Sequence, residues 1–265
     1  MSEEISMPNS ATPLRILQIS DLHLKTQPGS RVWGVDVDAS LDAVLACARE
    51  RHPTVDFILI TGDLVGDEPD AYPRVRQALE PFGVPVYCLP GNHDFPAAMG
   101  QHLRKGRVQW QRYVSVGDWQ VVLLNSSSPG APDGYLASSE LVLLDTVLAT
   151  SSKHTLVCLH HNPLSVDTPW LDTMMVTNGK ALFTVLDRYS QVRAVVWGHI
   201  HAEFSARRGD LHLLATPATC VQLKPGTAEP QVDEQPPGYR WFELYPDGRL
   251  ETGVERVDPA RYASS

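Results

Sequence analysis

The stretch LRILQISDLH, residues 14–23, is a run of branched apolar residues that ends in an acid and a histidine. An unbroken apolar run of this kind is typical of a strand buried on both faces, as in a parallel sheet covered by helices. Residues 37–51 follow with apolar positions at helical spacing, and DFILITG at 56–62 is a second apolar run. The start of the chain therefore predicts a strand, a helix and a parallel strand.

The same alternation continues along the chain. Helices are predicted at 70–83, 96–106, 138–150 and 179–189, strands at 84–91, 155–161 and 192–199, and a hairpin at 114–127. Strand-like pieces at 203–217, 239–248 and 249–257 then suit antiparallel strands that close a second sheet. Alternation of helices and strands indicates a layered α/β fold.

The length and composition favour one globular domain. At 265 residues with 43% hydrophobic and 20% charged residues, the chain resembles an ordinary folded protein, and single domains reach roughly 250 to 300 residues. We expect residues 1–265 to form a single domain, with a frayed leader at 1–13 and C-terminal strands and a loop at 220–265. The proline-rich segment 224–238 reads as a long surface loop.

Charge and cysteine usage limit the partners. The net charge of −9 argues against binding to nucleic acid or to an anionic membrane surface. The four cysteines, Cys47, Cys88, Cys158 and Cys220, are widely spaced and favour reduced thiols. The acidic start has no apolar signal region, and no run approaches the about 18 apolar residues of a membrane span. We expect a cytoplasmic protein with no membrane partner, either a monomer or a homodimer.

Polar residues of metal-ligand types follow five of the apolar runs. They are Asp21 and His23, Asp63, Asn92 and His93, His160 and His161, and His199 and His201. Open α/β sheets bind ligands at the carboxyl ends of their strands, where loops converge on a rigid base. The sequence therefore predicts one site at this edge.

Taken singly, each motif has an ordinary structural explanation. The D-x-H pattern occurs by chance after strands, G-D is more often a turn, and a single histidine is more often a surface or core residue. GHIH at 198–201 and GNHD at 91–94 are more specific. All five motifs in this order are hard to reconcile with independent turns.

These residue types suit a binuclear metal site. Carboxylates and imidazoles bind Mn, Fe or Zn, and the lack of thiolates argues against a structural zinc site. The seven candidate ligands are Asp21, His23, Asp63, Asn92, His160, His199 and His201. If one carboxylate bridges, they make two four-ligand sets, which is the arrangement that clamps a phosphoryl group between two ions about 3.5 to 4 Å apart.

With these motifs in this order, the chain resembles the calcineurin-like metallophosphoesterases, and within them the class III cyclic-nucleotide phosphodiesterases. Similarity extends through RILQISDLHL, LPGNHDF, LHHNPL, WGHIH and LLATPATCVQLKPG, from Leu14 to about Gly226. The resemblance implies a four-layer α/β sandwich of two packed mixed β-sheets flanked by helices. It also implies hydrolysis of 3',5'-cyclic AMP to 5'-AMP with two divalent metal ions, Fe or Mn or both.

The resemblance also implies a role for each residue. Asp21, His23, Asp63 and His201 would bind the first metal, and Asp63, Asn92, His160 and His199 the second. His23, Asp63, Asn92, His93 and His201 would contact substrate. His93 would face the phosphate as the catalytic residue, stabilise its charge and protonate the leaving group.

Several other residues have more than one possible role. Asp67 or Asp94 would hold the His93 tautomer, and Asp94 is equally suited to cap the following helix. His161 either supports the site or faces the substrate. Segments 126–136 and 167–175 and the loop around Lys224 are candidates to cover the base, whereas Tyr135 and Trp170 read as packing residues.

Two other functions compete with this prediction. One is a related phosphodiesterase acting on 2',3'-cyclic nucleotides or glycerophosphodiesters with the same metals. The other is an inactive sensor or scaffold, which would normally have lost some ligands, whereas all seven are present here.

Overall fold

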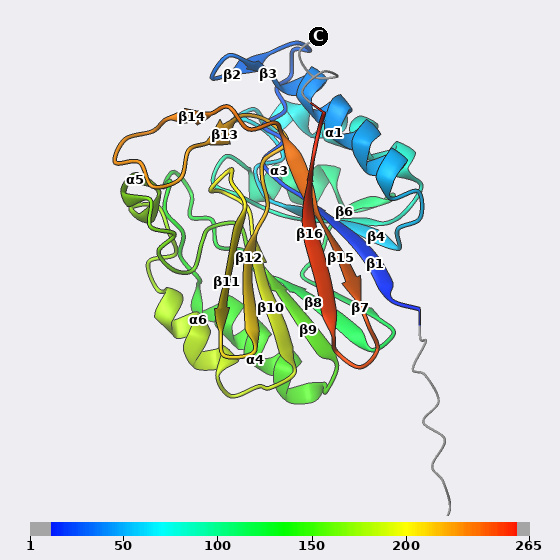
Figure 1. Ribbon diagram of the computed structural model, residues 1–265, viewed down its shortest axis with the longest axis vertical. Coiled ribbons are helices and arrows are strands. Elements are labelled where there is room, and N and C mark those ends of the chain that lie inside the picture. Colours follow the sequence, from blue (N-terminus) through cyan, green and yellow to red (C-terminus); the bar gives the residue numbers. More distant parts are fainter. Residues whose placement is uncertain (1–11, 259–265) are drawn as a thin grey trace, which may run out of the picture.

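Strands from both halves of the chain form two six-stranded mixed sheets in a computed structural model that describes residues 12–258 (Figure 1). The first sheet has the order β16 (Leu250–Arg256), β15 (Gly238–Leu244), β1 (Leu14–Ile19), β4 (Phe57–Thr61), β5 (Val86–Leu89) and β6 (Val108–Trp110). The second has the order β11 (Phe204–Arg208), β12 (Leu211–Ala215), β10 (Val192–Trp197), β9 (His154–Cys158), β8 (Trp119–Leu123) and β7 (Tyr113–Val116). The central pairs of both sheets are parallel.

Helices cover the outer face of each sheet. The first sheet packs against α1 (Val37–Arg51), α2 (Tyr72–Leu79) and α3 (Pro96–His102), with 3₁₀ turns η1 (Pro69–Ala71) and η2 (Glu80–Phe82) beside α2. The second packs against α4 (Ser138–Thr150), α5 (Pro169–Asp172) and α6 (Gly179–Leu186). Two short hairpins complete the structure, β2 (Arg31–Val32) with β3 (Val35–Asp36) and β13 (Gln222–Leu223) with β14 (Val232–Asp233).

Alternating side chains explain why the strands are apolar on both faces. In β1, Ile16 joins the core between the two sheets, whereas Leu17 joins the core beneath the helices. In β4, Leu59 points between the sheets and Ile58 points toward the helices in the same way. Successive side chains of a strand point to opposite faces, so a central strand of a four-layer sandwich is largely apolar on both faces. The predicted fold is confirmed.

The C-terminal strands differ from the prediction. Only β11 and β12 extend the second sheet, and β12 pairs parallel with β10. Strands β15 and β16 instead extend the first sheet, where β15 pairs antiparallel with β1. The reason is that β4 pairs with one edge of β1 and leaves the other free, and a β15–β16 hairpin covers that edge. The predicted loop 224–238 contains β14.

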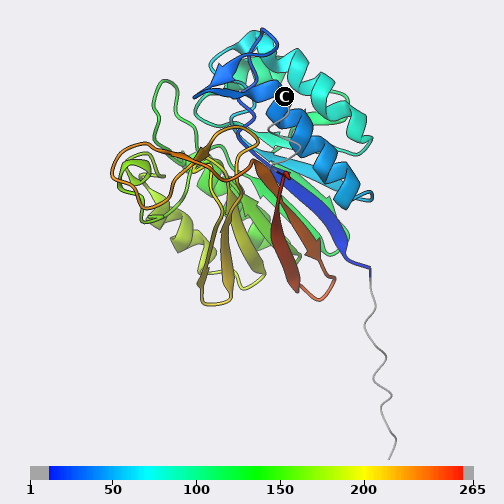
Figure 2. The ribbon, with the colours of Figure 1, turned by 45° about the horizontal axis from the view of Figure 1, so that its top comes forward.

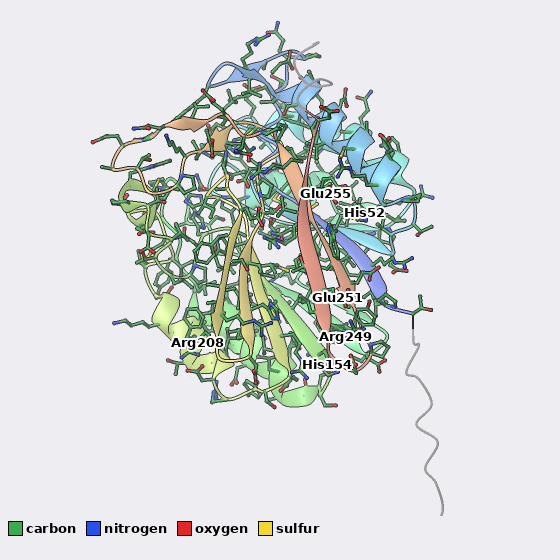
Figure 3. The ribbon with its side chains drawn as sticks, in the orientation of Figure 1. His52, His154, Arg208, Arg249, Glu251 and Glu255 are labelled. Carbon is green, nitrogen blue, oxygen red and sulfur yellow. The ribbon has the colours of Figure 1, made fainter. Side chains whose placement is uncertain are left out.

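The parallel strands of both sheets direct their carboxyl ends to the same side. In Figure 3, His154 at the start of β9 lies at the lower edge of the molecule. His160 follows the carboxyl end of the same strand. A hydrogen bond joins the two sheets near the carboxyl ends of their strands. The side-chain amide of Gln18 in β1 donates to the carbonyl of Trp197, the last residue of β10, at 2.9 Å. The loops after both sets of strands therefore share one edge.

Between residues 12 and 258, none of the helices has the length and hydrophobicity that a membrane crossing requires.

Candidate metal centre

The seven predicted metal ligands meet at the shared edge of the two sheets. Donor atoms of Asp21, His23, Asp63 and His201 lie within 4.8 Å of one another. On the other side of Asp63, His160 Nε2 lies 3.0 Å from Asn92 Oδ1. Loops after β1, β4 and β5 of the first sheet supply four of the seven, and loops after β9 and β10 of the second supply three.

Asp63 is the centre of this arrangement. Its Oδ2 lies 3.6 Å from His23 Nε2 and 3.3 Å from His160 Nε2. These two imidazoles belong to the two different ligand sets that the sequence predicts. The position of Asp63 between them fits a bridging carboxylate.

Left-handed backbone conformations concentrate at these positions. The φ angles are +57° at Asp21, +49° at His23, +51° at Asp63, +64° at His199 and +49° at His201. A side chain other than glycine in this region costs on the order of 1–3 kcal/mol, and such strain persists only where the surrounding structure holds it. The buried strands before each loop provide that support, so the donors are oriented before any ion binds.

Two glycines of the motifs are required by close approach. A Cβ atom added at Gly91 would overlap the carboxylate of Asp63, and one added at Gly198 would overlap the side chain of Ser20 beside Asp21. The glycines of GNHD and GHIH therefore let one ligand-bearing loop approach the next. This steric requirement explains why glycine precedes the ligands in both motifs.

Backbone carbonyls orient two imidazoles. His160 Nδ1 lies 2.8 Å from the carbonyl oxygen of Thr61, and His201 Nδ1 lies 2.8 Å from that of Val221. A carbonyl oxygen only accepts, so each Nδ1 carries a proton and Nε2 is the ring nitrogen that would bind a metal. His199 Nε2 is buried and has no hydrogen-bond partner among residues 12–258. An unpartnered buried nitrogen of this kind suits a metal ligand.

The electrostatics of Asp63 and His199 agree with metal binding. Burial alone would lower the pKa of His160, but the carboxylate of Asp63 raises it to about 9, so an ion would have to displace a proton there. Burial alone would raise the pKa of Asp63, but the neighbouring imidazoles, His160 foremost, hold it well below its ordinary value. Burial, followed by the nearby His161 and His160, holds the pKa of His199 well below its ordinary value. Metal binding requires an ionised carboxylate and a neutral imidazole. The oxygen and nitrogen donors of this edge therefore fit a binuclear site for divalent metal ions.

Asp67 contacts the imidazole of His93. Both carboxylate oxygens lie 2.9 Å from His93 Nδ1, so this nitrogen donates to them, and the backbone N–H of His93 donates to Asp63 at 2.9 Å. The described residues offer no hydrogen-bond partner to His93 Nε2, which leaves it available to a ligand. Of the two carboxylates considered for this role, the structure selects Asp67.

Asp94 neither holds His93 nor caps α3, whose N-cap is Phe95 without a side-chain cap. The carboxylate of Asp94 accepts from the backbone N–H groups of Leu64, Val65 and Gly91 and from the Tyr72 hydroxyl. Leu64 directly follows the central Asp63, and Gly91 precedes Asn92. Asp94 thus joins the two loops that carry these ligands.

His161 is fully buried behind the site. Its Nδ1 lies 2.9 Å from the Ser126 hydroxyl, and its ring packs 4.6 Å from that of His199, centroid to centroid. It does not line the cavity described next. Of the two roles left open, the structure favours support of the site over contact with substrate.

A cavity of about 380 Å³ opens over the metal-ligand side chains, within the ~300–1,000 Å³ range of small-molecule sites. One wall is polar and includes His23, Asp63, Asn92, His199 and His201, together with His93. The apolar side chains that line the rest of the cavity form a second wall, comprising Val32, Trp33, Pro132, Trp170, Leu171, Met174, Val221 and Leu223. The site therefore offers a metal-binding wall and an apolar wall.

The predicted covering segments contribute to the apolar wall unequally. Segment 126–136 supplies Pro132, segment 167–175 supplies Trp170, and Leu223 precedes Lys224. Trp170 packs against the core of the second sheet as predicted, and its indole N–H donates to Thr227 at 3.3 Å. The packing role predicted for Tyr135 is wrong, since that side chain is half exposed.

Sequence reasoning missed Trp33, Tyr72 and Ser126, which contact the cavity or support its residues. Of these three residues, only Trp33 lies in a recognisable local pattern. The dipeptide Trp33–Gly34 between two valines indicates a tight hairpin turn. Tyr72 and Ser126 reach the site through long-range contacts that no local pattern encodes.

Comparisons with known proteins agree with this geometry. A model of the family described as calcineurin-like phosphoesterase matches residues 14–203. The chain is 41% identical over 260 residues to the 3',5'-cyclic adenosine monophosphate phosphodiesterase CpdA of Pseudomonas aeruginosa, covering 97% of this chain and 95% of that protein. It is 38% identical to a 3',5'-cyclic-nucleotide phosphodiesterase of Nostoc sp., covering 94% of each. The resemblance predicted from the motifs is confirmed.

Solved structures support the fold. A dimetal phosphatase from Danio rerio aligns with a TM-score of 0.63 at 16% identity, covering 94% of this chain and 100% of that one. A purple acid phosphatase from yellow lupin aligns with a TM-score of 0.65 at 11% identity, covering 98% of this chain and 56% of that one. At these identities the likeness extends to the arrangement of sheets and helices alone.

Proposed function

The chain belongs to the calcineurin-like phosphoesterase family, and we propose that it hydrolyses 3',5'-cyclic AMP to 5'-AMP. The main support is the cavity, which is lined both by the gathered metal-ligand side chains and by an apolar wall. A cyclic nucleotide has the same two parts, a phosphodiester and a flat purine. Relatives named as cyclic-nucleotide phosphodiesterases match almost the whole chain, which adds to this support.

The proposed ligand sets are those implied by the motifs. Asp21, His23, Asp63 and His201, which lie together, would hold one ion, and Asp63, Asn92, His160 and His199 would hold the other. Two divalent ions, Fe or Mn by proposal, would supply a nucleophile from water near neutral pH and neutralise charge on the phosphate. Asn92 would bind through a neutral amide oxygen, which would add no charge that repels the phosphodiester. His23, Asp63, Asn92, His93 and His201 line the cavity where the phosphate would lie.

His93 is the proposed proton donor. Its Nδ1 donates to Asp67 at 2.9 Å, which orients the ring. From the protonated ring, Nε2 would donate either to a phosphoryl oxygen or to the departing 3'-oxygen. The ring of His93 lies 4.9 Å from that of His23, centroid to centroid, so the donor is adjacent to the metal ligands.

A comparison of substrates tests this function. We would measure kcat/KM for 3',5'-cyclic AMP, cyclic GMP, 2',3'-cyclic AMP and an aryl phosphodiester, with Mn or Fe supplied. We expect 3',5'-cyclic AMP to exceed the aryl ester clearly. Equal values would contradict the assignment and favour a related phosphodiesterase with the same metals.

Metal analysis separates an enzyme from an inactive scaffold of the same fold. We expect close to two ions per chain after reconstitution. Far fewer ions together with no turnover would favour the scaffold.

We also infer a single domain in the cytoplasm. Support for one domain comes from the core between the sheets, which includes Ile16 near the start of the described chain and Leu244 near its end. All four cysteines are free and buried, which is consistent with a reducing compartment.

A further inference from the structure

The tip of the β2–β3 hairpin carries a tryptophan in an unfavourable backbone position. Val32 pairs with Val35, so Trp33 and Gly34 form a two-residue turn, and their φ angles are +49° and +86°. Positive φ at both central positions defines a type I′ turn, for which Asn-Gly is the preferred sequence. Tryptophan at the first of these positions is strained, so the turn itself does not explain the residue.

Packing does not explain Trp33 either. Its side chain is 55% exposed, the largest exposed fraction of any tryptophan between residues 12 and 258. Within the same range it makes no hydrogen bond or ring contact, whereas Trp170 packs on the second core and donates to Thr227. A strained, exposed indole without a structural role is the kind of outlier that points to a function.

Trp33 lies at the edge of the cavity that holds the metal-ligand side chains. Figure 1 and Figure 2 show the β2–β3 hairpin projecting from the rest of the fold, and Trp33 at its tip is exposed. A phosphate held by the polar wall would leave the nucleoside part of the ligand facing the apolar wall. Within that wall, Trp33 offers the widest exposed aromatic surface.

We propose that Trp33 is a substrate-binding residue whose indole stacks on the purine ring of the nucleotide. This inference rests on the proposed function, because it requires a nucleotide in the cavity. Stacking recognises the face of a base and not its edge, so Trp33 contributes affinity for purines in general. Accordingly, Trp33 affects KM and product affinity and does not take part in the chemical step.

The variant Trp33→Asn separates stacking from folding. Asparagine is well tolerated at positive φ and restores the Asn-Gly turn while it removes the indole. We expect a melting temperature equal to or above that of the unaltered protein. Loss of a base stack should weaken 5'-AMP binding and raise the KM for cyclic AMP about tenfold, with kcat almost unchanged.

Calorimetry with Mn-loaded protein provides a readout that is independent of turnover. We would measure Kd for 5'-AMP, for 5'-GMP and for ribose 5-phosphate, which lacks a base. In Trp33→Asn we expect both nucleotides to weaken by similar factors and ribose 5-phosphate to bind as before. Tyr113→Ala, which removes an exposed aromatic side chain from β7 outside the cavity, is the matched control and should change none of the three.

Two results would overturn the inference. One is unchanged binding of 5'-AMP in Trp33→Asn, and the other is an equal loss for ribose 5-phosphate, which would mean that the hairpin acts on the phosphate wall. A wrong assignment of the enzymatic function would give a different result. The unaltered protein would then not turn over cyclic AMP, whatever the calorimetry of Trp33→Asn shows.

Discussion

The two walls of the cavity are built in opposite ways. The metal-binding wall consists of loops that follow buried central strands, and its donors Asp21, Asp63 and His160 are almost completely buried. Much of the apolar wall comes from the short elements β2–β3, α5 and β13, and Trp33 stands exposed on it. Chemistry requires donors held within about 0.5 Å of their positions, so it needs rigid elements. Binding of a flat ring tolerates looser support.

Substitution of the central carboxylate should have the largest effect on the metal-binding wall. In Asp63→Asn, the group between the two ligand sets loses its charge. We expect turnover of cyclic AMP to fall at least about 1,000-fold, because metal catalysis supplies several kcal/mol, and metal content to fall with it. Steady-state kinetics and metal analysis check both. Turnover close to normal would contradict the two-metal site.

The next largest effects should distinguish the role of His93 from that of its neighbour Asn92. His93→Ala should lower kcat about 100-fold, the loss typical of a general acid, and should leave metal content unchanged. Asn92→Ala should instead weaken binding of the second ion, because its amide lies beside His160. Metal titration of both variants provides the comparison. An equal loss of metal in both variants would contradict the assignment of metal binding to Asn92 and of proton donation to His93.

A smaller effect should follow from the close approach of two loops. In Gly91→Ala the new Cβ would push against Asp63, and we expect metal affinity to fall about 10- to 100-fold, as when a ligand is displaced slightly. Gly100→Ala in α3 is the matched control, because its Cβ meets only ordinary contacts with Trp110. Competition with a chelator measures both. Similar metal affinities in the two variants would show that overlap with Asp63 is not the reason for glycine at position 91.

The smallest expected effect comes from the hydrogen bond between Tyr72 and Asp94, which lies behind the metal-binding wall. Tyr72→Phe removes a donor from Asp94 and leaves the backbone N–H of Phe95 without its acceptor. A buried group left unpaired costs about 1–3 kcal/mol of folding free energy. Urea denaturation of the metal-free protein measures this loss. Tyr245→Phe, which breaks a similar but solvent-accessible contact with Glu243, should change the stability less, and an equal loss would contradict the prediction.

The helices and strands of the core could largely be predicted from local patterns. Helices at 37–51 and 138–150 agree with α1 and α4 in both bounds, since spacing of apolar residues reflects burial directly. Sheet membership of β15 and β16 could not be predicted in the same way, because a strand's pattern does not say which free edge it will join. The β2–β3 and β13–β14 hairpins are too short to show any period.

The sequence by itself determined the α/β order and the family resemblance and predicted the seven donor residues, because buried strands and metal ligands require particular residue types at particular places. Tertiary structure alone decided that Asp67 holds His93, that Asp94 joins two loops, and that Trp33 borders the cavity. Each of these depends on contacts between segments far apart in the chain. Such contacts are formed only when the two sheets pack, so no local pattern records them.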